Sequence, residues 1–149
     1  MEYDIRHYRD GDSTAISELW QLVFAEQAPH NLPVKIIADK LAMPPELGRQ
    51  LLLVCAREAQ IIGTTLAGWD GHRGWLYAVA VHPDWRRLGL GAALVRSAEQ
   101  ALTELGCSKV NLQIRAGNEA VVDFYRTLGY AVEARTSMGR LLTESSVPA

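Results

Sequence analysis

A strand, a glycine-containing turn and a helix follow one another without a gap in the middle of this 149-residue chain. The apolar run 75–81 leads into a turn that contains Arg86, Arg87, Gly89 and Gly91. Apolar residues then recur at the spacing of one helix face, at positions 90, 94, 98, 101, 102 and 105. This order requires a fold in which a strand passes directly into the N-terminus of a helix.

The residues around this unit predict the rest of a sheet. Alternating apolar and polar residues at 110–115 predict a strand after the helix, and a helical crossover favours parallel pairing of its two strands. Before the unit, segments 51–56 and 61–69 predict two strands, and Asp70-Gly71 is typical of a hairpin turn. We therefore expect three antiparallel strands in series, followed by a parallel one.

The two ends of the chain complete the prediction. Segment 3–8 predicts a first strand, and Asp12 or Ser13 then predicts the N-cap of a first helix. Pro33 predicts the start of a second helix, and Asn118 predicts the cap of a last helix. A closing hairpin is expected from the segments 130–135 and 137–142. The fold class is α/β (α+β): a mixed, mostly antiparallel sheet of about seven strands with about four helices, in the order β-α-α-β-β-β-α-β-α-β-β. One domain over residues 1–142 and a disordered tail over 143–149 are expected.

Composition restricts the classes of partner. Apolar residues make up 48% of the chain and charged residues 21%, as in soluble globular proteins. The formal net charge of −2 predicts no general affinity for nucleic acid or an anionic membrane. Cys55 and Cys107 lack the spacing of a metal site or redox motif, and the N-terminus lacks the pattern of a secretory signal. A cytoplasmic, metal-free protein is expected.

The turn after residue 81 has the chemistry of a pyrophosphate site. Gly89 and Gly91 let backbone amides approach a ligand, the helix N-terminus adds partial positive charge, and the two arginines add full charges. The dinucleotide fingerprint is absent because Leu94 occupies the place of its third glycine, and the P-loop pair Gly-Lys is absent as well. The alternative is a simple strand-to-helix loop with basic residues for solubility.

Two motifs together resemble the GNAT family of N-acetyltransferases. The first is Arg86-x-x-Gly89-x-Gly91, which resembles the family's acetyl-CoA signature. The second, one helix and one strand later, is Asn118-x-x-Val121-x-x-Phe124-Tyr125-x-x-x-Gly129-Tyr130. The order of elements also resembles that of the family over nearly the whole chain. Segment 68–74 and the ending Gly-Arg-Leu at 139–141 more narrowly resemble a YpeA-type bacterial branch.

The resemblance implies roles for particular residues. The strand residues Val79, Ala80 and Val81 would bind the pantetheine arm of acetyl-CoA, and Asn118 would contact it. The pyrophosphate would be bound by a continuous segment: Arg86, Arg87, Leu88, Gly89, Leu90, Gly91 and Ala92. Two positions depart from the family, because Arg87 stands where a glycine is common and Leu88 where a basic or polar residue is common.

Tyr125 matches the general acid of the family. A phenol with a pKa of ~10 is protonated at neutral pH and can protonate a departing thiolate whose conjugate acid has a pKa of ~8.5. Alternatively, Tyr125 is a core residue of an amphipathic helix, and Asn118 is simply its N-cap.

The general base remains open at this stage. Gln113 stands where relatives that acetylate ribosomal protein N-termini have a glutamate base, and an amide does not accept a proton near neutral pH. Asp70, His72, Glu119 or a chain of waters are the alternatives. The residues of the acceptor site are inferred only from their positions in the chain. They are Trp20, Phe24, Trp69, Tyr77 and Gln113.

The resemblance thus implies an acetyl-CoA-dependent N-acetyltransferase that transfers the acetyl group directly in a ternary complex. The expected acceptor is a primary amine of a small molecule, and a protein N-terminus or lysine is the alternative. A non-catalytic acetyl-CoA-binding module is the rival from another class. The sequence leaves open whether the protein is a homodimer.

Overall fold

The computed structural model describes residues 1–24 and 31–142. The chain divides into two compact units, residues 1–113 and residues 114–149. A single domain over residues 1–142 stays a prediction. The expected tail at 143–149 lies outside the described residues.

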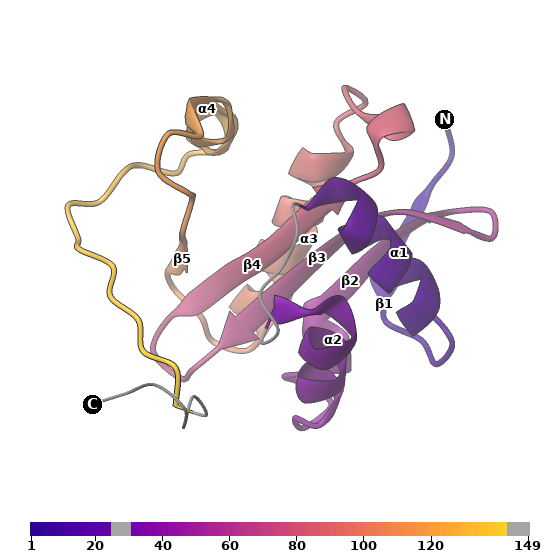
Figure 1. The fold of residues 1–149 in the computed structure, drawn as a ribbon, viewed down its shortest axis with the longest axis horizontal. Helices are drawn as coiled ribbons and strands as arrows, with labels where there is room; N and C mark the ends of the chain where they lie inside the picture. Colours follow the sequence, from indigo (N-terminus) through magenta and orange to yellow (C-terminus); the bar gives the residue numbers. More distant parts are fainter. Residues whose placement is uncertain (25–30, 143–149) are drawn as a thin grey trace. The chain divides into compact units, whose positions relative to one another are not determined.

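The first unit is built on a five-stranded sheet whose strands follow the order β1-β2-β3-β4-β5 (Figure 1). The strands are β1 (Asp4–His7), β2 (Leu52–Arg57), β3 (Gln60–Trp69), β4 (Gly74–Val81) and β5 (Val110–Leu112). The first four pair antiparallel, and β4 pairs with β5 in parallel. The prediction that the helical crossover joins two parallel strands is therefore confirmed.

Helices cover the two faces of this sheet. On one face, α1 (Ser13–Val23) and α2 (Pro33–Leu41) contribute Ile16, Trp20 and Ile37 to a core that includes Val54 of β2. On the other face, Leu90 and Leu94 of α3 (Leu90–Glu104) pack with the next strand residue, Cys55, and with Ile62. The change of face between neighbouring strand residues follows from the period of two along a strand. Each buried Leu or Ile contributes about 1.5–3 kcal/mol to folding.

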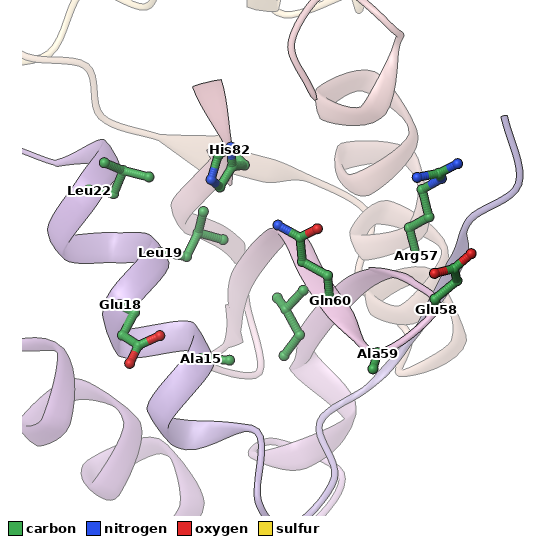
Figure 2. A pocket seen from close by; sticks show the side chains of 10 residues that line it. Ala15, Glu18, Leu19, Leu22, Arg57, Glu58, Ala59, Gln60 and His82 are labelled. Carbon is green, nitrogen blue, oxygen red and sulfur yellow. The ribbon is translucent and has the colours of Figure 1, made fainter. Parts of the chain in front are cut away.

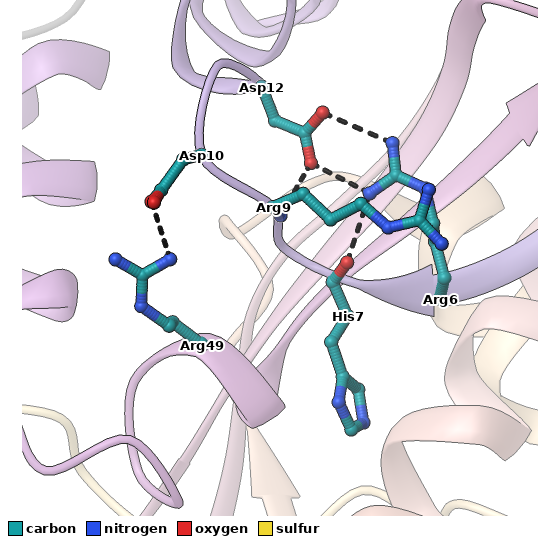
Figure 3. A network of polar contacts seen from close by, with 6 residues as sticks. All are labelled: Arg6, His7, Arg9, Asp10, Asp12 and Arg49. Carbon is teal, nitrogen blue, oxygen red and sulfur yellow. Dashed lines mark hydrogen bonds and ion pairs between the residues drawn. The ribbon is translucent and has the colours of Figure 1, made fainter.

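The junction between β1 and α1 uses Asp12 in an unexpected way. Asp12 is at the N-cap of α1, but its carboxylate makes no capping hydrogen bond. It accepts instead from the guanidinium of Arg6 at 2.8 and 3.1 Å and from the amide of Arg9 at 2.8 Å (Figure 3). Burial alone would raise the pKa of Asp12, but these bonds outweigh it and lower that pKa. Asp12 thus ties the first strand to the helix that follows it.

The second unit contains α4 (Glu119–Thr127), which matches the last predicted helix. The predicted closing hairpin at 130–135 and 137–142 is wrong, because these residues form no strand. Residues 131–142 are exposed, and Val132 and Met138 are 70% and 91% exposed. The propensity of a segment for β structure depends on packing and on a partner strand, and the local pattern of residues 130–142 records neither. Five strands, rather than about seven, are present in the described part of the chain.

Candidate functional site

The outer edge of β4 is open beyond its first three residues. β5 pairs only with Gly74, Trp75 and Leu76, so the rest of β4 has no strand beside it on that side among the described residues. The amide of His82 donates to Ile62 in β3 at 2.8 Å. Because backbone groups alternate in direction along a strand, those of Val79 and Val81 point away from β3. This edge therefore offers the amide and carbonyl of Val79 and the amide of Val81 to an extended ligand, whereas the carbonyl of Val81 accepts from Arg86.

A turn connects this open edge to α3. It begins with a short 3-10 helix, Pro83–Trp85, which His82 caps by accepting from the amide of Asp84 at 3.1 Å through Nδ1. Arg86 then folds back, and its Nε donates to the carbonyl of Val81 at 3.3 Å. The guanidinium of Arg86 is thus held at the same edge of β4 that lacks a partner strand.

The end of the turn presents free amides to solvent. The amides of residues 89–92 make no hydrogen bond within the described residues, as is typical of the first turn of a helix. Gly89 is at the N-cap of α3 with φ +78°, and a Cβ added there would meet no atom within 4 Å. The space around Gly89 is therefore open. Exposed amides, two arginines and the dipole of α3 together fit a pyrophosphate.

The turn contains a strained residue that the sequence did not reveal. Arg87 has φ +64°, in the left-handed region that favours glycine. This is the position at which the resemblance placed a glycine in other members of the family. The chain therefore keeps the backbone conformation of a glycine there while carrying a cationic side chain.

The other predicted residues of the first unit lie on the same strand, turn and helix. Ala80 lies between Val79 and Val81, and its side chain is buried in the core at 1% exposed. Leu90 is also buried at 1% exposed and anchors the start of α3, whereas Leu88 is 52% exposed. Gly91 and Ala92 are in the first turn of α3. The structure thus brings the whole predicted pyrophosphate segment together with the open edge of β4.

The remaining two predicted residues, Asn118 and Tyr125, belong to α4 in the second unit. Asn118 is at the N-cap, but its side chain makes no capping hydrogen bond. Tyr125 is 9% exposed and makes edge-to-face ring contacts with Phe124 and Tyr130, with centroid distances of 5.0 and 5.5 Å. Burial raises the pKa of Tyr125 to about 12, so its phenol stays protonated through the neutral range.

The structure gives Asp70 a structural role in the β3–β4 turn. Its Oδ1 accepts from the amides of His72 and Arg73, both at 2.7 Å. These bonds, the one from Arg73 first, lower the pKa of Asp70. A carboxylate with a lowered pKa is a weaker base, and the exposed His72 lies at the tip of the same hairpin.

A cleft of about 650 Å³ lies beside the start of the turn, and none of the predicted site residues lines it. Figure 2 shows its lining: Ala15, Glu18, Leu19 and Leu22 from α1, the β2–β3 turn at 57–61, and His82. The guanidinium of Arg57 lies 4.9 Å from the ring centre of Trp85 and so joins this turn to the 3-10 helix.

Two residues proposed for the acceptor site belong to the core. Trp20 is 3% exposed and donates from Nε1 to the hydroxyl of Thr64 at 2.7 Å. Phe24 packs against the same core cluster. Tyr77, in contrast, is 63% exposed. The sequence missed a buried lysine, Lys40, whose position in the apolar helix segment 33–41 was the available signal.

Neither the buried Cys55 nor a cluster of metal ligands supplies further chemistry among the described residues. Cys55 is fully buried, and burial raises the pKa of its thiol to about 11, which keeps it from acting as a nucleophile. The described residues hold no group of three or more His, Cys, Asp or Glu side chains suited to a metal ion. Within residues 1–24 and 31–142, no helix is long and apolar enough to cross a membrane.

Comparison with known proteins decides the family. The model of the acetyltransferase (GNAT) family matches residues 14–130. The chain belongs to the GNAT family. An acetyltransferase of Pectobacterium atrosepticum is 36% identical to it over 141 residues, which cover 95% of this chain and 96% of that protein. A second acetyltransferase, from Sodalis glossinidius, is 35% identical over 130 residues, or 87% of this chain and 88% of that one.

Solved structures show the same fold for this GNAT protein. Ard1 from Thermoplasma volcanium superposes with a TM-score of 0.75 at 22% identity, covering 89% of this chain and 84% of that one. The ribosomal-protein-S18-alanine N-acetyltransferase of Escherichia coli gives a TM-score of 0.72 at 23% identity, covering 86% and 77%. The family and its relatives make this GNAT protein an N-acetyltransferase.

Proposed function

We propose that this protein transfers the acetyl group of acetyl-CoA directly to a primary amine of a small molecule, within a ternary complex. One observation carries the proposal: the unpaired edge of β4 continues into a turn of free amides and arginines. An extended chain with amides, such as pantetheine, fits the groups of Val79 and Val81. A pyrophosphate fits the amides of residues 89–92 with Arg86 and Arg87.

The chemistry of the step is a simple exchange of bonds. The neutral amine attacks the thioester carbonyl, a C–N bond forms, and the C–S bond breaks. The amine nitrogen loses a proton to water, and the departing thiolate takes one from Tyr125. The phenol of Tyr125 carries the required proton at neutral pH, but burial raises its pKa to about 12 and so makes it a weaker acid than a free phenol. Water returns a proton to the phenolate after the transfer. Asn118, whose side chain makes no capping bond, is proposed to contact pantetheine.

Thermal unfolding with candidate ligands tests the cofactor. Acetyl-CoA should raise the Tm, because a ligand that binds only the folded state stabilises it, and NADH and ATP should raise it much less. Gly89→Val should abolish the shift, since its side chain would occupy the open space at this end of the turn, where the ligand is proposed to approach the backbone.

Gly11→Val is the matched control, because Gly11 also has a positive φ, +96°, and no neighbour within 4 Å of an added Cβ. It should lower the Tm of the free protein as Gly89→Val does and keep the acetyl-CoA shift. Equal stabilisation by NADH would contradict the acetyl-CoA assignment.

Gln113 separates this proposal from peptide acetylation. If the acceptor is a small amine, wild-type protein should leave N-terminal peptides unmodified, and CoA release should require an amine from a pooled library. If an ancestral peptide activity was lost with the base, Gln113→Glu should restore it. Strong peptide acetylation by the wild type would favour the protein acceptor, and turnover of no amine would favour a non-catalytic acetyl-CoA-binding module.

A further inference from the structure

The ring of Tyr77 lies over a glycine in the β3–β4 hairpin. Gly68 pairs with Trp75, and the register shift at Leu66/Ala67 leaves Tyr77 as an extra residue on β4. A Cβ on Gly68 would lie 2.8 Å from Cε2 of Tyr77, so the ring of Tyr77 lies against the glycine backbone. Tyr77 is nevertheless 63% exposed and available to a ligand.

A carboxylate of the hairpin bonds the ring of the neighbouring Trp75. Oδ2 of Asp70 accepts from Nε1 of Trp75 at 3.3 Å, while Oδ1 is occupied by the two amides of the turn. The turn amides keep the pKa of Asp70 low, so the group is charged at neutral pH. Burial raises the pKa of Tyr77, and the charge of Asp70 raises it further, which indicates that the carboxylate acts on the phenol. We call Asp70, Trp75 and Tyr77 the hairpin patch.

We propose that the hairpin patch binds a cationic group at the far end of the acceptor, so that the substrate is a primary amine carrying a second, permanently charged group. A carboxylate beside aromatic rings is a combination that binds organic cations. His72 and Arg73 also lie on this hairpin. Asp70 accepts hydrogen bonds from their backbone amides, and His72 also acts on it electrostatically. The inference rests on the proposed function, since it names the acceptor of that reaction.

The position of the patch suits this role. Tyr77 precedes Val79 by two residues, or about 7 Å along the strand. The open edge proposed to hold pantetheine therefore begins next to the patch, and a short aliphatic chain spans the gap. The attacking amine must be neutral, whereas a guanidinium remains charged at any assay pH. The group held by Asp70 is accordingly the second cation rather than the reacting amine.

Kinetics with two amines of equal chain length test the inference. Wild-type protein should show a higher kcat/KM for 4-guanidinobutylamine than for butylamine. Asp70→Asn keeps an oxygen for the turn amides but removes the charge, and Tyr77→Leu removes the ring. Each should lower the ratio of the two kcat/KM values by about 2- to 5-fold, the size of one exposed cation–π contact. Glu58→Gln, in the β2–β3 turn, is the matched carboxylate control and should leave the ratio unchanged.

A binding measurement separates failure of this inference from failure of the proposed function. Butylguanidine carries the cation but no primary amine, and its affinity for the protein with CoA present can be measured by calorimetry. Binding that weakens in Asp70→Asn and Tyr77→Leu, but not in Glu58→Gln, supports the patch even if neither amine is acetylated. An unchanged ratio of kcat/KM, or butylguanidine binding that is absent or insensitive to both variants, overturns it.

Discussion

Arg87 combines a strained backbone angle with a charged side chain. Arg87 holds a left-handed backbone angle, φ +64°, which costs a non-glycine residue about 1–2 kcal/mol. Its side chain lies in the turn that faces the proposed pyrophosphate.

Substitution of Arg87 separates the two effects. Arg87→Gly should exceed Arg87→Ala in free energy of unfolding by about 1 kcal/mol, because only glycine relieves the angle. Both should weaken acetyl-CoA binding by a similar factor, about 2- to 5-fold, since both remove the same exposed charge. Urea unfolding and acetyl-CoA titration measure these quantities. Equal stabilities would show that the angle carries no strain.

Lys40 is the other residue with an unusual environment. Its side chain comes from α2, is 8% exposed, and donates from Nζ to the carbonyl of Ala67 in β3. No carboxylate pairs with it among the described residues. Burial lowers the pKa of Lys40 to about 8 from an ordinary value of 10.5. The ammonium therefore loses its proton more readily in the folded chain than in the unfolded one.

This difference predicts a pH dependence of stability. Between pH 8 and 10.5 the unfolded chain binds more protons at Lys40, so its contribution to the free energy of unfolding rises with pH in that window. Below pH 8 both states are protonated and the contribution is constant at its lowest value. Urea unfolding at pH 7, 8.5 and 9.5 should show that the free energy of unfolding of wild type rises relative to that of Lys40→Met as the pH rises. A constant difference between the two would contradict the lowered pKa.

Among the elements, α4 and the N-terminus of α3 carry the proposed chemistry. α4 buries Tyr125 against the rings of Phe124 and Tyr130, so its phenol is supported by packing on its own unit. α3 begins at a glycine N-cap and leaves its first amides free. Each element serves its role through a local feature, a buried phenol in one and unpaired amides in the other.

Tyr125→Phe tests the role of α4. The phenyl ring keeps the packing with Phe124 and Tyr130, so the Tm should stay close to that of wild type. The affinity for acetyl-CoA should stay within a few-fold of the wild-type value. The value of kcat should fall by about 10²- to 10⁴-fold, as expected for loss of a general acid. Loss of folding would instead assign Tyr125 a core role, and an unchanged kcat would assign the proton to water.

At the scale of the whole molecule, the two units differ in how their chains are held. The sheet of residues 1–113 is covered by helices on both faces, whereas residues 131–142 are exposed and form no strand. A backbone segment without strand partners is open to a protease, and a paired strand is not.

Limited proteolysis tests this difference. Trypsin should cut first after Arg135 and Arg140, both exposed in segment 131–142, and later after Arg57 at the end of β2. Mass spectrometry of early digests identifies the sites. Early protection of Arg135 and Arg140 would indicate that the hairpin expected from the sequence forms in solution.

Much of this fold and part of the candidate site could be predicted from local patterns. The helix from Leu90 and the hairpin at Asp70 are confirmed. Turn chemistry and helical periodicity act over a few residues, so the sequence records them directly. The grouping of Arg86 to Ala92 at one strand-to-helix junction is likewise a feature that the local sequence predicts.

Other features depend on residues far apart in the chain, and only the tertiary structure decided them. Periodicity marks a side chain as buried without naming its partner, so Trp20 could be placed in an acceptor site although it bonds Thr64 in the core. Strand pairing likewise depends on which edges meet, which left β4 open beyond Leu76 and segment 131–142 without a partner. The sequence by itself determined the helices, the turns and the cationic glycine loop. The open edge and the buried Lys40 arose from long-range packing, because the energy of those contacts belongs to pairs of segments rather than to either one.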